Sequence, residues 1–371
     1  MRNEHRMVKE HTVRLNPEMR NSEVEAFEKE LLKRVVGQDR AVQKLVQTYQ
    51  VFKAGLASPD RPLASLLLLG PTGSGKTHVA ETAAEILFGS RSALLKVDCA
   101  EFQHSHEVSK LIGSPPGYLG HRESPAALSQ ENVNRFRTPE NDFSLVLFDE
   151  IEKASEALWQ LLLGILDRGN LTLGDNRRVD FSRVIILMTS NLGAKEMSQL
   201  IEGSMGFAPA RQAEEPSLDL DQKIYRVAVQ ACKKKFSPEF MNRLDSIIVF
   251  QSLRPEDFRR ILDLELCAIQ SRIRQSSDGK FVLNCTEAAR KALLSEGVDA
   301  NYGARHLKRV LERRVVVPAA NLLASGQLAS QERLIVDYMA PNVWTYSKPA
   351  RAWEWTSTEK TEVACAGAAA A

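Results

Sequence analysis

The residues best suited to chemistry form a glycine-rich segment that ends in a lysine and a threonine. Residues 70–77 read GPTGSGKT, which fits the phosphate-binding pattern GxxxxGK[ST]. Glycines let backbone N–H groups curl around phosphates, and a helix that starts there directs its positive end toward them. In this pattern the lysine, Lys76, reaches the β- and γ-phosphates, and the hydroxyl of Thr77 is a ligand for Mg²⁺. We therefore expect a nucleotide site that comprises Gly70, Pro71, Thr72, Gly73, Ser74, Gly75, Lys76 and Thr77; the alternative is a glycine-rich turn.

Two adjacent carboxylates, Asp149 and Glu150, follow the apolar run Leu145–Phe148. Ligands of parallel α/β sheets bind at the carboxyl ends of the strands, so both carboxylates are expected beside the phosphates. Asp149 suits the coordination shell of Mg²⁺, and Glu150 suits polarisation of the attacking water. The alternative is an ordinary helix start, where acidic residues are also favoured. The glycine-rich segment upstream favours the catalytic interpretation.

Short apolar runs alternate with helical patterns around these residues. Runs that are wholly apolar, as expected of strands buried on both faces, occupy residues 65–69, 145–148 and 184–188. Helical spacing covers residues 79–87 and 157–166, and residues 22–49 with a break at Val36-Gly37. This alternation predicts an α/β fold in which a three-layer P-loop domain has a parallel sheet.

After about residue 253 the pattern becomes mainly helical, over residues 255–274, 286–295 and 304–325. The short apolar segments 281–283 and 334–336 are expected to pair as a small sheet. The sequence thus predicts a large domain at residues 21–252 and a small, mainly helical α+β C-terminal domain at residues 253–340. Residues 1–20 are expected to be a flexible lead-in and residues 341–371 a disordered tail.

The composition is that of an ordinary globular protein, with 43% hydrophobic and 26% charged residues. Forty-nine Lys+Arg balance 47 Asp+Glu, which disfavours a protein built mainly to bind nucleic acid. Lys233-Lys234-Lys235 is interpreted as a solvated face. No apolar run reaches the ~18–20 residues of a membrane span, and the charged N-terminus lacks a secretory signal. We therefore expect a cytoplasmic protein without membrane contact.

Further segments at fixed distances from the glycine-rich segment make the pattern more specific. The chain resembles the second ATPase module of the Clp family of AAA+ unfoldases and disaggregases, in a single-ring form. The resemblance covers about residues 20–340 and implies ATP and Mg²⁺ as cofactors, and a homo-oligomeric ring that we expect to be a hexamer. Besides residues 70–77 and 148–153, it is carried by Arg34–Gln38 (RVVGQ), Lys110–Gly120 (KLIGSPPGYLG), Met188–Asn191 (MTSN), Pro238–Asp245 (PEFMNRLD) and Gly303–Arg305 (GAR).

The resemblance gives roles to four residues outside the phosphate loop. Val36 is expected to pack on the adenine. Asn191 resembles the polar sensor that holds the lytic water near the γ-phosphate. Arg243 resembles the arginine finger, which completes the site of the neighbouring subunit and stabilises charge on the phosphoryl oxygens. Arg305 resembles the second sensor, which reports the γ-phosphate to the small domain.

A substrate loop is expected at Gly117, Tyr118, Leu119 and Gly120. In the Clp family this loop lines the central pore and grips unfolded polypeptide by side-chain contact. Tyr118 offers a large contact surface that tolerates many sequences, and Leu119 stands where valine is commoner. The alternative is a buried tight turn.

A segment that resembles a peptidase-docking tripeptide stands at Met205, Gly206 and Phe207. Clp unfoldases that feed a barrel-shaped peptidase carry an aliphatic–Gly–Phe or –Leu tripeptide here, on a flexible loop. The resemblance therefore adds a Clp-type peptidase to the expected partners. In the alternative Phe207 packs back on its own domain, and the protein remodels substrates without a peptidase.

Three functions remain in competition. The first is a ring-forming unfoldase that threads unfolded polypeptides, and the second is an ATP-gated assembly or scaffold module with little turnover. A scaffold could dispense with Asp149, Glu150, Asn191 and Arg243, so their presence favours the enzyme. The third, a nucleic acid motor, is disfavoured by the charge balance and by the predicted pore loop.

Overall fold

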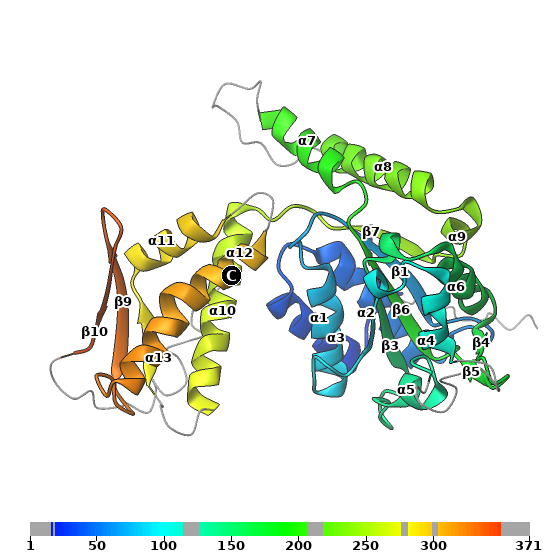
Figure 1. Ribbon diagram of the computed structural model, residues 1–371, viewed down its shortest axis with the longest axis horizontal. Coiled ribbons are helices and arrows are strands. Elements are labelled where there is room, and N and C mark those ends of the chain that lie inside the picture. The colour runs from blue at the N-terminus through cyan, green and yellow to red at the C-terminus, as the bar shows by residue number, and fades with distance from the viewer. Residues whose placement is uncertain are drawn as a thin grey trace, which may run out of the picture.

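The computed structural model describes residues 16–17, 19–113, 126–205, 218–275, 281–298 and 303–349. Figure 1 shows a large domain, which contains the main sheet, and beside it a small domain of helices and a narrow sheet. In the described part of the chain, no helix has both the length and the apolarity of a membrane span.

Five parallel strands form the main sheet, in the order β2-β3-β6-β1-β7. The three strands predicted from apolar runs, β1, β3 and β6, lie together at its centre, and Leu67 is in register with Met188 on one side and Ile247 on the other. The strands are β1 Ala64–Leu69, β2 Leu95–Asp98, β3 Ser144–Asp149, β6 Val184–Ser190 and β7 Ser246–Val249.

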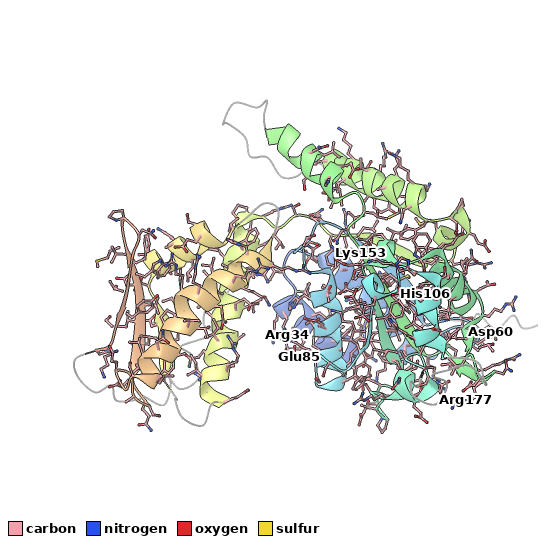
Figure 2. All side chains as sticks on the ribbon, viewed as in Figure 1. Arg34, Asp60, Glu85, His106, Lys153 and Arg177 are labelled. Carbon is pink, nitrogen blue, oxygen red and sulfur yellow. The ribbon has the colours of Figure 1, made fainter. Side chains whose placement is uncertain are left out.

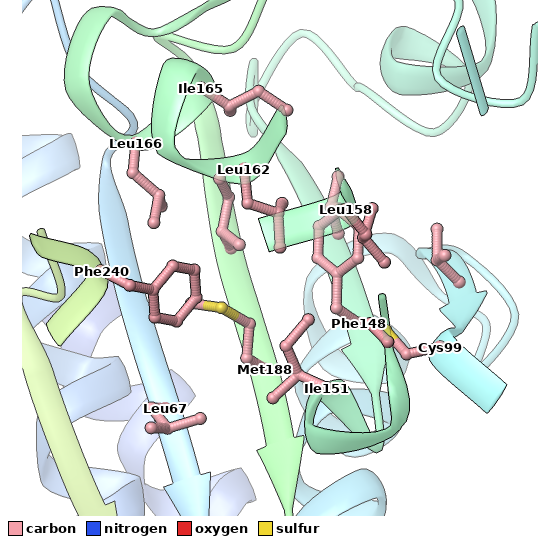
Figure 3. Packing of buried hydrophobic residues seen from close by; sticks show 14 of the residues in the cluster. Leu67, Cys99, Phe148, Ile151, Leu158, Leu162, Ile165, Leu166, Met188 and Phe240 are labelled. Atoms are coloured by element: carbon pink, nitrogen blue, oxygen red, sulfur yellow. The ribbon is translucent and has the colours of Figure 1, made fainter. Parts of the chain in front are cut away.

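Alternate residues of each strand enter two separate cores. Leu66 and Leu68 pack with α1 (Ser22–Arg34), α2 (Asp39–Lys53) and α3 (Lys76–Phe88). Leu67 and Leu69 point to the other face. There α6 (Glu156–Arg168) lays Leu158, Leu162 and Leu166 over the strands, near Phe148 and Met188 (Figure 3). The predicted three-layer α/β architecture is therefore confirmed.

Shorter elements complete the large domain. The helices α7 and α8 follow β6 and form a hairpin at one end of the domain (Figure 1). The remaining elements are η1 Cys99–Glu101, η2 Ser105–Val108, α4 Ser109–Ile112, α5 Gln130–Asn134, η3 Ile151–Lys153, β4 Asn170–Thr172, β5 Arg178–Asp180, α7 Ala194–Met205, α8 Leu218–Lys235 and α9 Pro238–Asn242.

The small domain contains a helical layer packed on a three-stranded sheet, β10-β9-β8. As predicted, residues 281–283 and 334–336 pair, because β8 and β9 are parallel neighbours. The predicted helix at 304–325 is interrupted by a π-helical segment, Glu312–Val316, just before Pro318, whose ring removes one backbone donor. The elements are α10 Pro255–Gln275, β8 Val282–Cys285, α11 Glu287–Gly297, α12 Ala304–Leu311, α13 Val317–Ala324, β9 Arg333–Met339 and β10 Val343–Ser347.

The expected disordered tail at residues 341–371 begins too early. Residues 343–347 form β10, which pairs antiparallel with β9 in the register Trp344↔Tyr338. Trp344 packs on the small-domain core, stacks edge-on against Tyr338 and donates from Nε1 to Glu296 (3.3 Å). These aromatic contacts stabilise β10. The sequence did not predict this strand because the residues around residue 341 are polar.

Candidate functional site

The phosphate loop lies at the carboxyl end of β1 and leads directly into α3. Gly70 touches the segment after β7 so closely that a Cβ there would lie 2.8 Å from the Phe250 carbonyl oxygen. The N-terminus of α3 has no side-chain cap, and its N-cap residue, Gly75, has a φ of 99°. Its first N–H groups are therefore available to an anion.

Lys76 is buried among acceptors in the middle of this loop. Its Nζ donates to the Gly70 and Pro71 carbonyl oxygens (2.7 and 2.9 Å) and to Asn191 Oδ1 (2.8 Å). Burial lowers the pKa of Lys76 to about 8, although the carboxylate of Glu152 opposes that shift. The ammonium is thus a desolvated cation whose present partners are neutral oxygens, as expected of a group that receives phosphate.

The loop also holds a polar atom that lacks a partner. Ser74 is only 4% exposed, and its Oγ makes no hydrogen bond within the described residues. Buried hydroxyls normally have a partner. Together with the uncapped helix and Lys76, this hydroxyl fits a site that takes a phosphate chain.

Asp149 ends β3 and lies beside Thr77. The Thr77 Oγ1 is 3.2 Å from Asp149 Oδ1, Lys96 Nζ is 3.0 Å from Oδ2, and Thr189 also donates to Oδ1. Burial opposes ionisation of Asp149, but these donors outweigh it and hold the pKa of the carboxyl below its usual value. A hydroxyl and an ionised carboxylate are the oxygen ligands that Mg²⁺ prefers, so Thr77 and Asp149 fit the predicted metal site.

Glu150 adopts a backbone conformation that is rare for its residue type, with φ 56° and ψ 50°. Its backbone N–H donates to Thr189 Oγ1 (3.0 Å), and its carboxylate pairs with Lys153 and lies 3.5 Å from Asn191 Nδ2. Asn191 therefore stands between Lys76 and Glu150, one amide atom toward each. The structure brings together the predicted lysine, carboxylates and sensor. Figure 2 labels Lys153, the ion-pair partner of Glu150, in the large domain.

Val36 and Gln38 lie between α1 and α2, next to the loop. Val36 is buried outside the core that Val35 enters. Gln38 Nε2 donates to the Ser74 carbonyl (3.2 Å) and to the Gln251 carbonyl (3.0 Å), so it links the loop to the connection between the domains. Sequence reasoning gave Gln38 no role, although it stood in a matched motif.

The small domain contacts the phosphate loop through the start of α12. The Ala304 N–H faces the Gly73 carbonyl (3.4 Å), and a Cβ on Gly303 would lie 2.9 Å from that oxygen. Arg305 follows, is exposed, and its charge acts on Lys76. The ion pair of Arg34 and Glu85 (3.5 Å), labelled in Figure 2, lies on the side of the large domain that faces the small one.

Arg243 lies at the opposite end of the sheet from Lys76, Asp149, Glu150 and Asn191. Its carbonyl accepts from Ser65 Oγ (3.1 Å) at the start of β1, about 17 Å of strand before the phosphate loop. Its guanidinium pairs with Asp167 (2.5 Å) in a groove of about 410 Å³ formed by α6, β4 and α9. Arg243 is therefore not part of its own chain's nucleotide site.

Two predicted segments fall wholly or partly outside the described residues. The pore loop, Gly117–Gly120, lies there, and so do Gly206 and Phe207 of the docking tripeptide. Met205 is described only as the last residue of α7, so at this residue the backbone is helical and not the loop that was expected.

These contacts define a class of protein: a P-loop ATPase domain with a small helical domain seated on its phosphate loop. Comparison with known families makes this more specific. The chain belongs to the AAA family: residues 61–247 match the family described as AAA domain (Cdc48 subfamily). Residues 253–336 match the C-terminal, D2-small domain, of ClpB protein. The Clp-type AAA+ resemblance is thereby confirmed.

Curated proteins and solved structures are similar to this chain. Chaperone protein ClpB 1 of Thermosynechococcus vestitus is 38% identical over 311 residues, 84% of this chain and 33% of that protein. Chaperone protein ClpB of Agrobacterium fabrum is 37% identical over 332 residues, 90% of this chain and 35% of that protein. A closed-state cryo-EM reconstruction of Hsp104 with ATPγS and FITC casein has a TM-score of 0.72 and 29% identity, covering 88% of this chain and 52% of that one. The chain thus spans about a third of the length of these curated relatives.

Proposed function

We propose that this chain hydrolyses ATP and uses the energy to remodel polypeptides as a chaperone motor. The observation that carries the proposal is the bridge from Lys76 through Asn191 to Glu150, at the end of the sheet where Thr77 and Asp149 also meet. A scaffold that only binds nucleotide has no use for a carboxylate aligned by a sensor. The similarity to proteins named as chaperones supports polypeptide as the substrate.

Each residue of the bridge has a part in the proposed reaction. Lys76 exchanges its carbonyl partners for the β- and γ-phosphates, and Ser74 and the α3 N-terminus add donors around them. Thr77 and Asp149 would hold Mg²⁺, which would neutralise charge on the phosphate oxygens. Glu150 orients the attacking water and takes its proton, and Asn191 keeps that water in place. Arg305 carries the state of the phosphates to the small domain.

In this proposal a second copy of the chain supplies the positive charge that stabilises the phosphoryl oxygens. Because Arg243 lies about 17 Å of strand away from its own phosphate loop, it serves the site of a neighbour in a ring, a hexamer by resemblance. Its side chain is 37% exposed beside the groove of α6, β4 and α9, which suits an intersubunit position.

Threading through the ring is the finer part of the proposal and depends on Tyr118. We expect Tyr118→Ala to leave basal ATP hydrolysis unchanged and to abolish translocation of a tagged reporter protein. An unfolding rate equal to that of the wild type would exclude the pore role.

Peptidase delivery is a second branch, which rests on the resemblance of Met205-Gly206-Phe207 to a docking tripeptide, although Met205 itself still belongs to α7. A Clp-type peptidase from the same organism should co-migrate with the wild type in ATP and not with Phe207→Ala. If the two bind alike, or neither binds, the protein remodels substrates without a peptidase.

The proposed function is tested by measuring ATP hydrolysis with and without an unfolded model protein. We expect hydrolysis that the unfolded chain stimulates, and Glu150→Gln should bind nucleotide while losing nearly all turnover. Tight binding with negligible turnover in the wild type would favour the scaffold alternative. Turnover of Glu150→Gln within a few-fold of the wild type would contradict the role of Glu150.

A further inference from the structure

Glu152 contacts the backbone of the predicted sensor, Asn191, although the sequence provides no reason to expect a role for Glu152. It lies in the 3₁₀ turn Ile151–Lys153 that follows the unusual backbone of Glu150. Its Oε1 accepts a hydrogen bond from the backbone N–H of Asn191 (3.1 Å). This N–H belongs to the first residue after β6, which ends at Ser190.

The second carboxylate oxygen of Glu152 is unsatisfied. Oε2 is buried and has no hydrogen-bond partner in the described part of the chain. A carboxylate that is half used and shielded from water destabilises a fold relative to a neutral acceptor of the same shape. Stability alone therefore does not explain a glutamate here.

The charge of Glu152 acts on the catalytic lysine. Among the charged groups that influence Lys76, Glu152 has the largest effect, and it favours the protonated ammonium. Glu152 therefore acts on the bridge in two ways. It accepts a hydrogen bond from the Asn191 backbone, and its negative charge acts on Lys76, the partner of Asn191 Oδ1.

We propose that Glu152 is a positioning residue, which fixes the Asn191 backbone so that its side-chain amide points at Lys76 with Oδ1 and at Glu150 with Nδ2. The inference rests on the proposed ATP hydrolysis. Without this anchor the Asn191 amide swings away from the attacking water, while the phosphate loop keeps its own donors and still binds nucleotide.

The first test separates binding from turnover. Glu152→Ala should lower kcat between about tenfold and a hundredfold, the range for small misplacements of a catalytic group, and change the Kd for a fluorescent ADP analogue by less than about threefold. Glu152→Gln keeps an acceptor for the Asn191 N–H, so it should restore kcat to within about threefold of the wild type. The matched control is Glu156→Ala, an exposed carboxylate of α6 that should change neither quantity.

Two further readouts show whether Glu152 acts through Asn191. In nucleotide-free protein, the backbone amide of Asn191 should exchange with deuterium faster in Glu152→Ala than in the wild type or Glu152→Gln. The double variant Glu152→Ala/Asn191→Ala should turn over no more slowly than Asn191→Ala alone, because the anchor has nothing left to position.

These measurements distinguish a failure of the positioning role of Glu152 from a failure of the proposed ATP hydrolysis. Additive losses in the double variant, equal losses in Glu152→Gln and Glu152→Ala, or unchanged exchange at Asn191 would each overturn the positioning role. Wild-type turnover in Glu152→Ala would do the same. If the wild type itself does not hydrolyse ATP, the proposed function fails, whereas the exchange measurement on Asn191 still tests the anchor.

Discussion

At the scale of single residues, the site is organised around one buried ammonium and the groups that compete for it. Lys76 donates to two loop carbonyls and to Asn191, and burial keeps its pKa near 8. Phosphate oxygens are stronger partners than carbonyls because they carry charge. Nucleotide binding therefore replaces the neutral partners of the buried Lys76 ammonium with negatively charged ones.

The depressed pKa of Lys76 makes nucleotide affinity depend on pH. Below about pH 8 the ammonium is protonated before the nucleotide arrives; above it, binding must take up a proton. At pH 9 about nine-tenths of the lysines are neutral, so affinity for ADP should be roughly tenfold weaker than at pH 7. Titration calorimetry at several pH values measures this. Lys76→Arg, which stays protonated, should lack the dependence, and an equal dependence in that variant would assign it to another group.

The sequence identified the residues that are expected to contact the nucleotide better than the residues that hold them in place. Lys76, Asp149, Glu150 and Asn191 stand in local patterns at strand ends, and the structure brings them together. Gln38, by contrast, bonds to Ser74 and Gln251, and Glu152 bonds to Asn191; partners so far apart in the chain leave no periodic or local signal.

At the scale of elements, the parallel sheet was predictable because its central strands are apolar on both faces, and β10 was not. Val343–Ser347 mixes exposed and half-buried positions, and it follows a turn that looks like the start of a tail. Its stability comes from cross-strand contacts: Trp344 packs on Tyr338 and bonds to Glu296, and Tyr346 donates to the Arg314 carbonyl (2.8 Å).

Removal of β10 should therefore destabilise the small domain. We expect Trp344→Ala to lower the free energy of unfolding by about 2 kcal/mol, roughly half the loss for a fully buried tryptophan. Deletion of residues 341–371 should be at least as damaging, and deletion of residues 350–371, which leaves β10 intact, is the matched control. Urea denaturation measures all three. Equal stability of the two truncations would show that β10 adds nothing.

The contact of α12 with the phosphate loop predicts an effect of Gly303 on nucleotide binding. Gly303 has a φ of 53°, and an added Cβ would lie 2.9 Å from the Gly73 carbonyl oxygen. Gly303→Ala should push α12 and Arg305 off the loop and weaken ATP affinity by about tenfold, the equivalent of about 1.4 kcal/mol. Gly326→Ala is the control, because Gly326 has a φ of 70° but nothing within 4 Å. Equal affinities in the two variants would mean that the contact between Gly303 and Gly73 does not support nucleotide binding.

At the scale of the whole molecule, one chain carries the predicted nucleotide site at one end of the sheet and the predicted arginine finger near the other. Lys76, Asp149, Glu150 and Asn191 gather at the carboxyl end of the sheet, while Arg243 is held by Asp167 near its other end. Residues at opposite ends of a domain can meet between copies arranged head to tail, and such contacts form a ring when the rotation from copy to copy closes. Assembly is therefore part of the proposed catalysis.

The measurement that tests this most directly is ATP turnover in mixtures of two inactive variants. Arg243→Ala keeps Glu150, and Glu150→Gln keeps Arg243, so mixed assemblies contain interfaces with both groups intact. We predict that each variant alone is nearly inactive, and that mixing restores turnover above the sum of the two. Replacing the Arg243→Ala partner by Arg243→Ala/Glu150→Gln should remove the recovery, since no intact Glu150 remains. No recovery in assemblies shown to contain both variants, or full activity of Arg243→Ala alone, would contradict a site completed between subunits.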